Sequence, residues 1–347
     1  MRQGRERRIG DGWEYYSRCT LCPRVCGTDR TRRRGFCGET ADLRLAAASI
    51  HRGEEPPVTG RGGSGTVFVS GCGLGCVFCQ NYQISHRNRI SRSAATGRPV
   101  GTEEFARICL ALEAKGAENI NIVTGSHAVP AIAAGLDAAR AAGLAIPVLW
   151  NSSAYENPDA LELLEGRIDG WLPDLKTLDP VLADRFFRAP DYPDAAPAAI
   201  LKMLAISSRP GTGVPAGPGD ASPPATTVEK SIGPAAPLFI VRHLILPGCL
   251  DSTRQVLRWF ADHAVGRAQL SLMTQYTPVK TPDAGPARYL DGDEYARVLD
   301  WLDEFGIEEG FCQEPVPGSD WLPDFTRLNP FSSDLSIPVW HWKEGFL

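Results

Sequence analysis

The sequence lacks an apolar run long enough to cross a lipid bilayer. A membrane-spanning helix needs roughly 20 consecutive apolar residues, and no stretch of the 347 residues approaches that length. Residues 1–10 are rich in arginine and no apolar segment follows them, so the pattern of a secretory signal peptide is missing as well. We therefore expect a cytoplasmic protein with no membrane partner.

The basic part of the chain lacks the pattern of a nucleic-acid-binding surface. Residues 1–44 carry 11 arginines against 6 acidic residues, although the whole chain has a net charge of -5. Surfaces that stack bases interleave aromatic and basic residues, whereas these arginines lie between cysteines. We do not expect nucleic acid as a partner, and we interpret the arginines as compensating a negatively charged metal–thiolate centre.

Cysteine, in contrast, is abundant. Seven of the ten cysteines fall in two tight groups. In a reducing compartment such groups are more often metal ligands than disulfides, because the cytosol keeps thiols reduced. The hydrophobic content of 43% is enough for a substantial core, so we expect a globular metalloprotein.

Short apolar runs alternate with amphipathic stretches along most of the chain. The predicted strands are residues 66–70, 120–124, 147–151, 170–175, 239–246 and 270–276. The predicted helices are residues 102–115, 130–142, 158–164, 180–187, 195–204, 252–264 and 293–305. This alternation predicts an α/β fold with a parallel sheet and helical crossovers, either an open doubly wound sheet or a partial barrel.

The composition divides the chain into three segments. Residues 1–58 form a cysteine-rich metal-binding arm, and residues 59–309 contain the strand–helix units. Within the second segment, residues 207–236 are rich in Gly, Pro, Ala and Ser, which predicts a flexible surface insertion. Residues 310–347 show little periodicity, and we expect an extended C-terminal tail whose tryptophans, such as Trp340, add buried area.

The second cysteine group directly follows the first predicted strand. Cys72, Cys76 and Cys79 supply three thiolates, and a 4Fe-4S cluster held by three thiolates keeps one iron open for a ligand. The glycines at 71, 73 and 75 permit positive φ and close backbone approach to such a cluster. The competing interpretation is a zinc site in which His86 is the fourth ligand.

The spacing Cys-x3-Cys-x2-Cys at the end of the first strand resembles the signature of the radical S-adenosylmethionine (SAM) superfamily. Other segments resemble, within that superfamily, a branch of enzymes similar to the pyruvate formate-lyase activating enzyme. These segments are CTLCPRVCG at 19–27, CQNY at 79–82, NSSAYE at 151–156, LPDLK at 172–176, RHLILPG at 242–248 and QYTP at 275–278. Together they extend over most of the chain from residue 19 to residue 278.

This resemblance implies a partial (β/α)6 barrel with the cluster at the C-terminal mouth of its strands. It implies that the open iron binds SAM and that the reduced cluster cleaves SAM to a 5'-deoxyadenosyl radical, which abstracts a hydrogen atom from an unidentified protein or small-molecule substrate. A glycyl-radical enzyme is one such substrate. The implied oxidoreductase also needs a reductant such as flavodoxin or ferredoxin.

The resemblance also implies roles for individual residues. Asp174 and Lys176 match an Asp-x-Lys element that helps to hold SAM, and their spacing places both side chains on one face of a strand. His243 matches a position near the nucleotide. Activating enzymes usually carry Gly-Gly-Glu-Pro at the second strand, but this chain has no carboxylate there, so contact with the SAM amino group passes to Thr124, Ser126 or backbone carbonyls.

The first cysteine group predicts a second metal centre. Cys19, Cys22, Cys26 and Cys37 can close either a tetrahedral zinc site or an auxiliary 4Fe-4S cluster. Four thiolates leave no coordination position open, which favours a structural or electron-transfer role. A hypothesis from another class is a non-catalytic iron-sulfur or zinc protein that carries electrons or scaffolds a partner.

Overall fold

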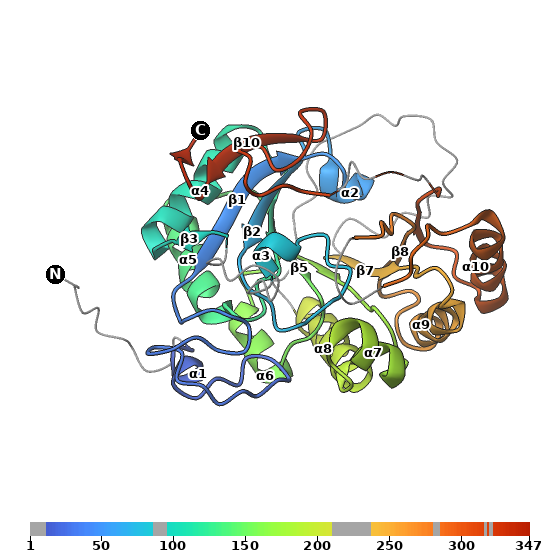
Figure 1. Ribbon diagram of the computed structural model, residues 1–347. Coiled ribbons are helices and arrows are strands. Elements are labelled where there is room, and N and C mark those ends of the chain that lie inside the picture. Colours follow the sequence, from blue (N-terminus) through green and yellow to red (C-terminus); the bar gives the residue numbers. More distant parts are fainter. Residues whose placement is uncertain (1–11, 86–95, 210–236, 280–284, 316–317, 319–321) are drawn as a thin grey trace.

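The computed structural model describes residues 12–85, 96–209, 237–279, 285–315, 318 and 322–347 (Figure 1). The candidate ligand His86, residues 1–11 and residues 210–236 of the insertion predicted at 207–236 lie outside the described residues. The first residue of that insertion, Ser207, is the last residue of a helix. The centre of the molecule is an 11-stranded sheet with the order β11-β10-β1-β2-β4-β5-β6-β7-β8-β9, and β3 pairs with β1 in addition.

Seven neighbouring strands of this sheet are parallel: β2 (Ser64–Val69), β4 (Ile120–Val123), β5 (Val148–Ser152), β6 (Gly170–Pro173), β7 (Leu238–Leu244), β8 (Gln269–Met273) and β9 (Gly310–Cys312). The first six are the strands that periodicity predicted, with ends shifted by at most a few residues. The prediction of an α/β fold built as a partial barrel is confirmed.

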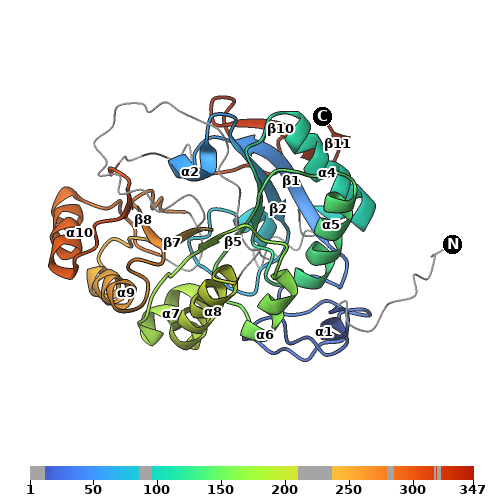
Figure 2. The same ribbon diagram turned by 180° about the vertical axis from the view of Figure 1, so that it is seen from behind.

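Helices follow most of the parallel strands and cover the outside of the curved sheet (Figures 1 and 2). They are α4 (Thr102–Ala114), α5 (Val129–Ala141), α6 (Pro158–Leu161) with the short 3-10 turn η1 (Glu162–Leu164), α7 (Pro180–Phe187), α8 (Tyr192–Ser207), α9 (Leu250–His263) and α10 (Gly292–Phe305). Pro130, Pro158 and Pro180 lie in first turns, where the missing amide donor costs nothing.

At one edge of the sheet, antiparallel strands pair segments that are far apart in the sequence. β1 (Arg44–His51) pairs on one side with β2 and on the other with β10 (Ser336–His341), and β10 pairs with β11 (Gly345–Phe346). The short β3 (Arg98–Pro99) also pairs with β1. Sequence analysis missed these strands, and the sheet therefore runs across both boundaries of the three-segment division, which stays a prediction.

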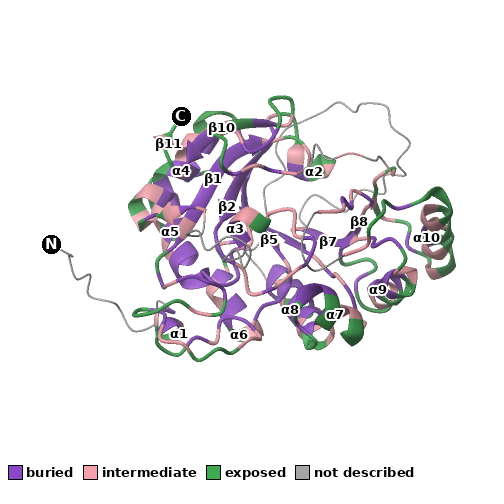
Figure 3. Ribbon diagram, viewed as in Figure 1, coloured by how far each residue is buried: buried purple, intermediate pink, exposed green. Residues whose placement is uncertain are grey.

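The interior of the barrel is layered. Val58, Leu149, Leu172 and Ile240 form a small apolar cluster at its floor. Val58 belongs to α2 (Pro56–Thr59), which follows β1. A much larger apolar cluster lies between the sheet and the outer helices, and Figure 3 shows the strands largely buried, while α7 and α10 expose much of their surface. Among the described residues, no helix combines the length and hydropathy needed to traverse a membrane.

Candidate functional site

The three-cysteine loop lies at the C-terminal rim of the parallel strands. Cys72, Cys76 and Cys79 are free, partly exposed thiols between β2 and the short helix α3 (Tyr82–Ser85). Backbone bonds fix the loop to the end of α7, since Gly75 N donates to Phe187 O at 2.9 Å. Burial raises the pKa of the Cys72 thiol to about 12 and also raises the pKa values of Cys76 and Cys79. We expect such thiols to lose their protons only when a metal ion binds to the sulfur atoms.

The loop glycines have two different functions. Of the three glycines, Gly71 uses the permitted positive φ, at 92°, and Gly73 and Gly75 do not. These two glycines permit close packing instead. A Cβ on Gly75 would lie 2.9 Å from Cγ of Arg188, and one on Gly73 would lie 3.4 Å from Sγ of Cys22.

The donor set of the loop consists of three cysteine thiols. Across residues 12–85, 96–209 and the other described stretches, no three His, Cys, Asp or Glu side chains are close enough to hold one metal ion. In a cubane each thiolate binds a different iron, so its ligands stand further apart than the ligands of zinc. Cys72 and Cys79 both act electrostatically on Cys76, so the three thiols lie near one another, as the ligands of one cluster would.

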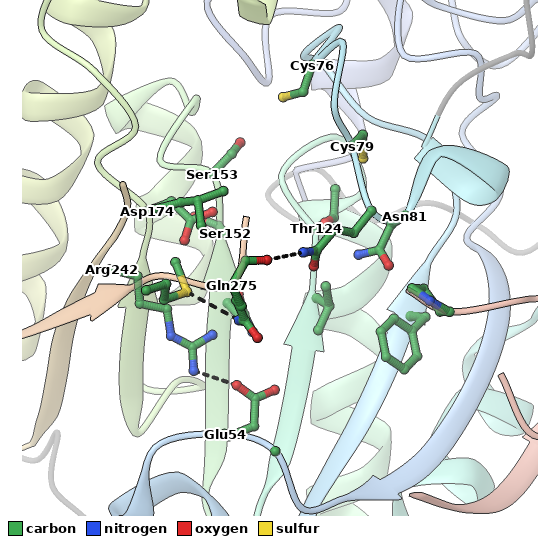
Figure 4. A pocket seen from close by; sticks show the side chains of 18 of the residues that line it. Glu54, Cys76, Cys79, Asn81, Thr124, Ser152, Ser153, Asp174, Arg242 and Gln275 are labelled. Atoms are coloured by element: carbon green, nitrogen blue, oxygen red, sulfur yellow. Dashed lines mark hydrogen bonds and ion pairs between the residues drawn. The ribbon is translucent and has the colours of Figure 1, made fainter. Parts of the chain in front are cut away.

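A cavity of about 280 Å³ opens beneath the loop, inside the barrel. Cys76 and Cys79 lie at one end of it, and Glu54 and Arg242 lie at the other (Figure 4). The polar residues along its walls come from the C-terminal ends of successive parallel strands. They are Thr124 after β4, Asn151, Ser152 and Ser153 at β5, Asp174 and Lys176 after β6, and Gln275 after β8.

Asp174 and Lys176 both line the cavity and pair with each other. Nζ of Lys176 donates to Oδ2 of Asp174 at 2.6 Å, and each side chain is only about one fifth exposed. Burial opposes the charge of Lys176, but the Asp174 carboxylate and the nearby Cys76 thiol outweigh burial and raise the pKa of Lys176. The buried hydroxyl of Tyr192 lies 2.7 Å from the Asp174 carbonyl oxygen and accepts from Lys176 N, which fixes the backbone of the pair.

The other predicted SAM-binding residues are dispersed. Thr124 lines the cavity and has a positive φ of 64°. Ser126 is buried but is not among the residues that line the cavity. His243 points to the opposite face of β7, where its Nδ1 bonds to Leu175 O at 2.7 Å and its Nε2 to Thr253 Oγ1 at 3.0 Å. The structure therefore does not bring His243 to the predicted site.

Sequence reasoning missed the far end of the cavity. Arg242, the neighbour of His243, faces inward and forms ion pairs with Glu54 and Glu55. Burial opposes the charge of Glu55, but Arg242 lowers the pKa of that carboxyl. Two adjacent acidic residues after a strand, Glu54 and Glu55, could have indicated this part of the site, but sequence analysis did not predict the strand β1 that precedes them.

Two of the four N-terminal cysteines, Cys22 and Cys37, lie directly beside the three-cysteine loop. Cys19, Cys22 and Cys37 are at most 8% exposed, whereas Cys26 is exposed. Burial raises the pKa of the Cys22 thiol to about 12, and Cys72 N lies 3.4 Å from Cys37 O. The second metal centre stays a prediction.

Arginines hold the arm and support the loop. Buried Arg30 donates to the carbonyl oxygens of Glu39, Thr40 and His127 and lies 3.8 Å from Cys19 Sγ. Arg24 donates from Nε to Gly73 O at 3.0 Å. Arg30 thus lies near one thiol of the arm. The interpretation that the arginines compensate a metal–thiolate centre stays a prediction.

Solved structures align with part of this chain. The protein aligns with SuiB of Streptococcus suis bound to S-adenosylmethionine at 14% identity and a TM-score of 0.46, over 70% of this chain and 48% of SuiB. It aligns with the FeFe-hydrogenase maturase HydG of Carboxydothermus hydrogenoformans at 10% identity and a TM-score of 0.47, over 76% of this chain and 60% of HydG. The chain thus spans about half the length of SuiB.

Sequence comparisons are more specific. An uncharacterized protein of Methanocaldococcus jannaschii is 25% identical over 297 residues, which cover 84% of this chain and 76% of that protein. Residues 66–206 match the family model of the radical SAM superfamily. This match begins in β2, includes the three-cysteine loop and the Asp174–Lys176 pair, and ends in α8. Residues 66–206 of this protein are therefore similar to the radical SAM superfamily over that range.

Proposed function

We propose that this protein is a radical SAM enzyme that binds a 4Fe-4S cluster on Cys72, Cys76 and Cys79. The observation that carries the proposal is that Cys76 and Cys79 of the three-thiol loop line the same cavity as the paired charges of Asp174 and Lys176. When bound, the reduced cluster and SAM would supply a 5'-deoxyadenosyl radical for hydrogen abstraction from a substrate.

The residues at the loop end of the cavity have the chemistry to hold SAM. Lys176 is kept charged and fixed by Asp174, so it offers a positive partner for the SAM carboxylate. Thr124 and the polar residues Asn151, Ser152 and Ser153 provide hydrogen-bonding groups along the same rim for the rest of the molecule. We include no role for His243, because its two ring nitrogens bond on the other face of the sheet.

Aromatic side chains shield the loop from water. Phe78 packs edge-on against Phe187 and Tyr276, with ring centroids 5.7 and 5.3 Å apart. Gln80, the residue after Cys79, donates from Nε2 to Gln275 O at 3.2 Å and so ties the loop to the end of β8. Excluding water in this way protects a reactive intermediate from side reactions.

The finer parts of the proposal depend on sequence motifs. The likeness to the pyruvate formate-lyase activating enzyme supports an oxidoreductase whose substrate is a protein or a small molecule, with flavodoxin or ferredoxin as reductant. Four thiols in the N-terminal arm, of which three are buried and two lie beside the cluster loop, support a second centre of zinc or 4Fe-4S. Activation of a glycyl-radical enzyme belongs to the same proposal.

The test is SAM cleavage by the reconstituted protein. The protein is loaded with iron and sulfide under anaerobic conditions, reduced with dithionite and mixed with SAM, and 5'-deoxyadenosine is measured by liquid chromatography. We expect product from the wild type and from the matched control Cys109→Ala, whose thiol is buried in α4 away from the cavity. We expect none from Cys76→Ala.

Two results would contradict the proposal. One is zinc without iron in the three-cysteine loop of oxygen-protected protein. The other is undiminished 5'-deoxyadenosine from Cys76→Ala. A non-catalytic electron carrier or scaffold would bind iron but form no 5'-deoxyadenosine in either protein.

A further inference from the structure

The end of the cavity opposite the thiols is a separate polar site. Figure 4 shows Glu54 and Arg242 at this end, distant from Cys76 and Cys79. Glu54 follows β1 in the chain, and Arg242 lies on β7, on the opposite wall. The site therefore lies between the antiparallel edge and the parallel strands, at the end of the cavity away from the thiols.

The charges at this site do not balance. Glu55 pairs with Arg242 through two guanidinium nitrogens, with Nε at 2.9 Å from Oε1 and Nη2 close to Oε2. Glu54 shares the same Nη2, at 2.6 Å from its Oε2. One guanidinium thus serves two carboxylates whose side chains are only 8% and 14% exposed. A buried carboxylate without its own cation is costly, and Glu54 is the one that lines the cavity.

Two polar side chains at this end each carry an atom without a partner among the described residues: Asn121, which lies next to the cavity-lining Glu54 but does not line the cavity itself, and His51, which does. Asn121 on β4 is fully buried, and its Nδ2 donates to Glu54 Oε1 at 3.2 Å, which leaves its Oδ1 without a partner among the described residues. Nδ1 of the cavity-lining His51 also has no partner within the described stretches. Burial lowers the pKa of His51, so the neutral ring can accept a hydrogen bond.

The walls around these acceptors are apolar. Phe68, Phe331, Leu335 and Met273 line the cavity together with Glu54. The rings of Phe331 and His51 lie 4.7 Å apart between centroids. Aromatic faces attract cations and pack against alkyl chains. A ligand that matches this site has a positively charged hydrogen-bond donor on an apolar stem.

We propose that this end of the cavity binds a primary ammonium or guanidinium group carried on an alkyl chain, with the nitrogen at Glu54 and the stem against Phe68 and Phe331. The assignment of this group to the substrate rests on the proposed function, whereas the cation preference of the site does not. The substrate is then an alkylamine-type molecule or a lysine or arginine side chain of a peptide.

The first experiment measures the selectivity of the wild-type protein. Protonated n-butylamine, n-butanol and butyrate are titrated into the reconstituted protein at neutral pH, and binding is followed by saturation-transfer NMR. A charge-assisted hydrogen bond is worth about 1.5–3 kcal/mol, so the cation should bind at least roughly tenfold more tightly than either isostere. This comparison needs no variant and is unaffected by folding defects.

Two variants locate the binding. Glu54→Gln keeps the size of the side chain and removes the charge, so it should weaken n-butylamine binding by roughly tenfold or more. Glu304→Gln, at an exposed residue of α10 that pairs with Arg254, is the matched control and should bind as the wild type does. A capped Gly-Lys-Gly peptide distinguishes a peptide side chain from a free amine, and its norleucine analogue is the uncharged control. If the lysine peptide binds more tightly than n-butylamine, the ligand is a peptide side chain; if it binds less tightly, the ligand is a free amine. Either result agrees with a cation-binding site.

Equal binding of the three small probes, or binding of none of them, would overturn the inference and leave Glu54, Glu55 and Arg242 as a purely structural cluster. The proposed function is measured separately as 5'-deoxyadenosine from the wild type. Product without cation preference refutes only the inference. Cation preference without product refutes the proposed function and retains a cation site.

Discussion

The two faces of the same strands differ in how completely their polar groups are satisfied. On β7, Arg242 points inward and shares its guanidinium between two carboxylates, beside acceptors that have no described partner. The next residue, His243, points outward, where both ring nitrogens are bonded and the side chain is 1% exposed. The comparison indicates that the inner face is built for a ligand and the outer face for the fold.

The largest effect is expected from removing the inner guanidinium. Arg242→Met leaves Glu54 and Glu55 buried without a cation, which should lower the free energy of unfolding by about 3–5 kcal/mol at neutral pH. Chemical denaturation measures the change. Adding Glu54→Gln and Glu55→Gln to the same variant should restore much of the loss. An unaltered stability of the single variant would show that the inner charges are not coupled.

On the outer face, the contribution of His243 to the free energy of unfolding should depend on pH. Burial lowers the pKa of His243 from 6.5 to about 4 in the folded protein. The unfolded chain therefore binds a proton that the folded chain excludes, so this stability is complete above pH 6.5 and is lost as the pH falls toward 4. The loss amounts to about 3 kcal/mol.

His243→Asn tests this linkage, because the amide can still donate to Leu175 O but does not titrate. We expect chemical denaturation between pH 7 and pH 4 to show a smaller loss of unfolding free energy in the variant than in the wild type. The difference should be about 3 kcal/mol. Parallel pH profiles would contradict the assignment of acid sensitivity to His243.

A smaller effect, limited to ligand binding, is expected at the loop end of the inner face. Lys176→Met removes the positive partner proposed for the SAM carboxylate, so SAM affinity should fall by about 10- to 100-fold, equivalent to the loss of a charged hydrogen bond. Equilibrium dialysis with labelled SAM measures it. Lys202→Met, which removes a lysine paired with Glu162 outside the cavity, is the control. Equal affinities in all three proteins would remove Lys176 from the proposed site.

The sequence predicted the parts of the fold that a local pattern of residues determines. Parallel strands buried on both faces are continuous apolar runs, so the six predicted strands were placed within a few residues. Asp174 and Lys176 also both line the cavity, although they follow β6 and do not lie within the strand to which the spacing rule was applied.

The rest of the site required three-dimensional information. β1 reads RLAAASIH, in which three successive alanines favour helix, and only pairing on both edges makes it a strand. Periodicity shows that Arg242 and His243 face opposite ways, but it does not show which of them faces the barrel interior. The roles of Gly73 and Gly75 likewise depend on contacts with Cys22 and Arg188, which are remote in sequence.

The antiparallel edge has a consequence for biosynthesis. β10 pairs with β1, and the segment before it brings Pro323, Phe331 and Leu335 to the cavity wall. A ribosome makes the thiols and the paired charges long before this wall. The cavity gains this wall only after translation has passed β10, so the thiols and the paired charges are synthesised well before the segment that completes the cavity lining.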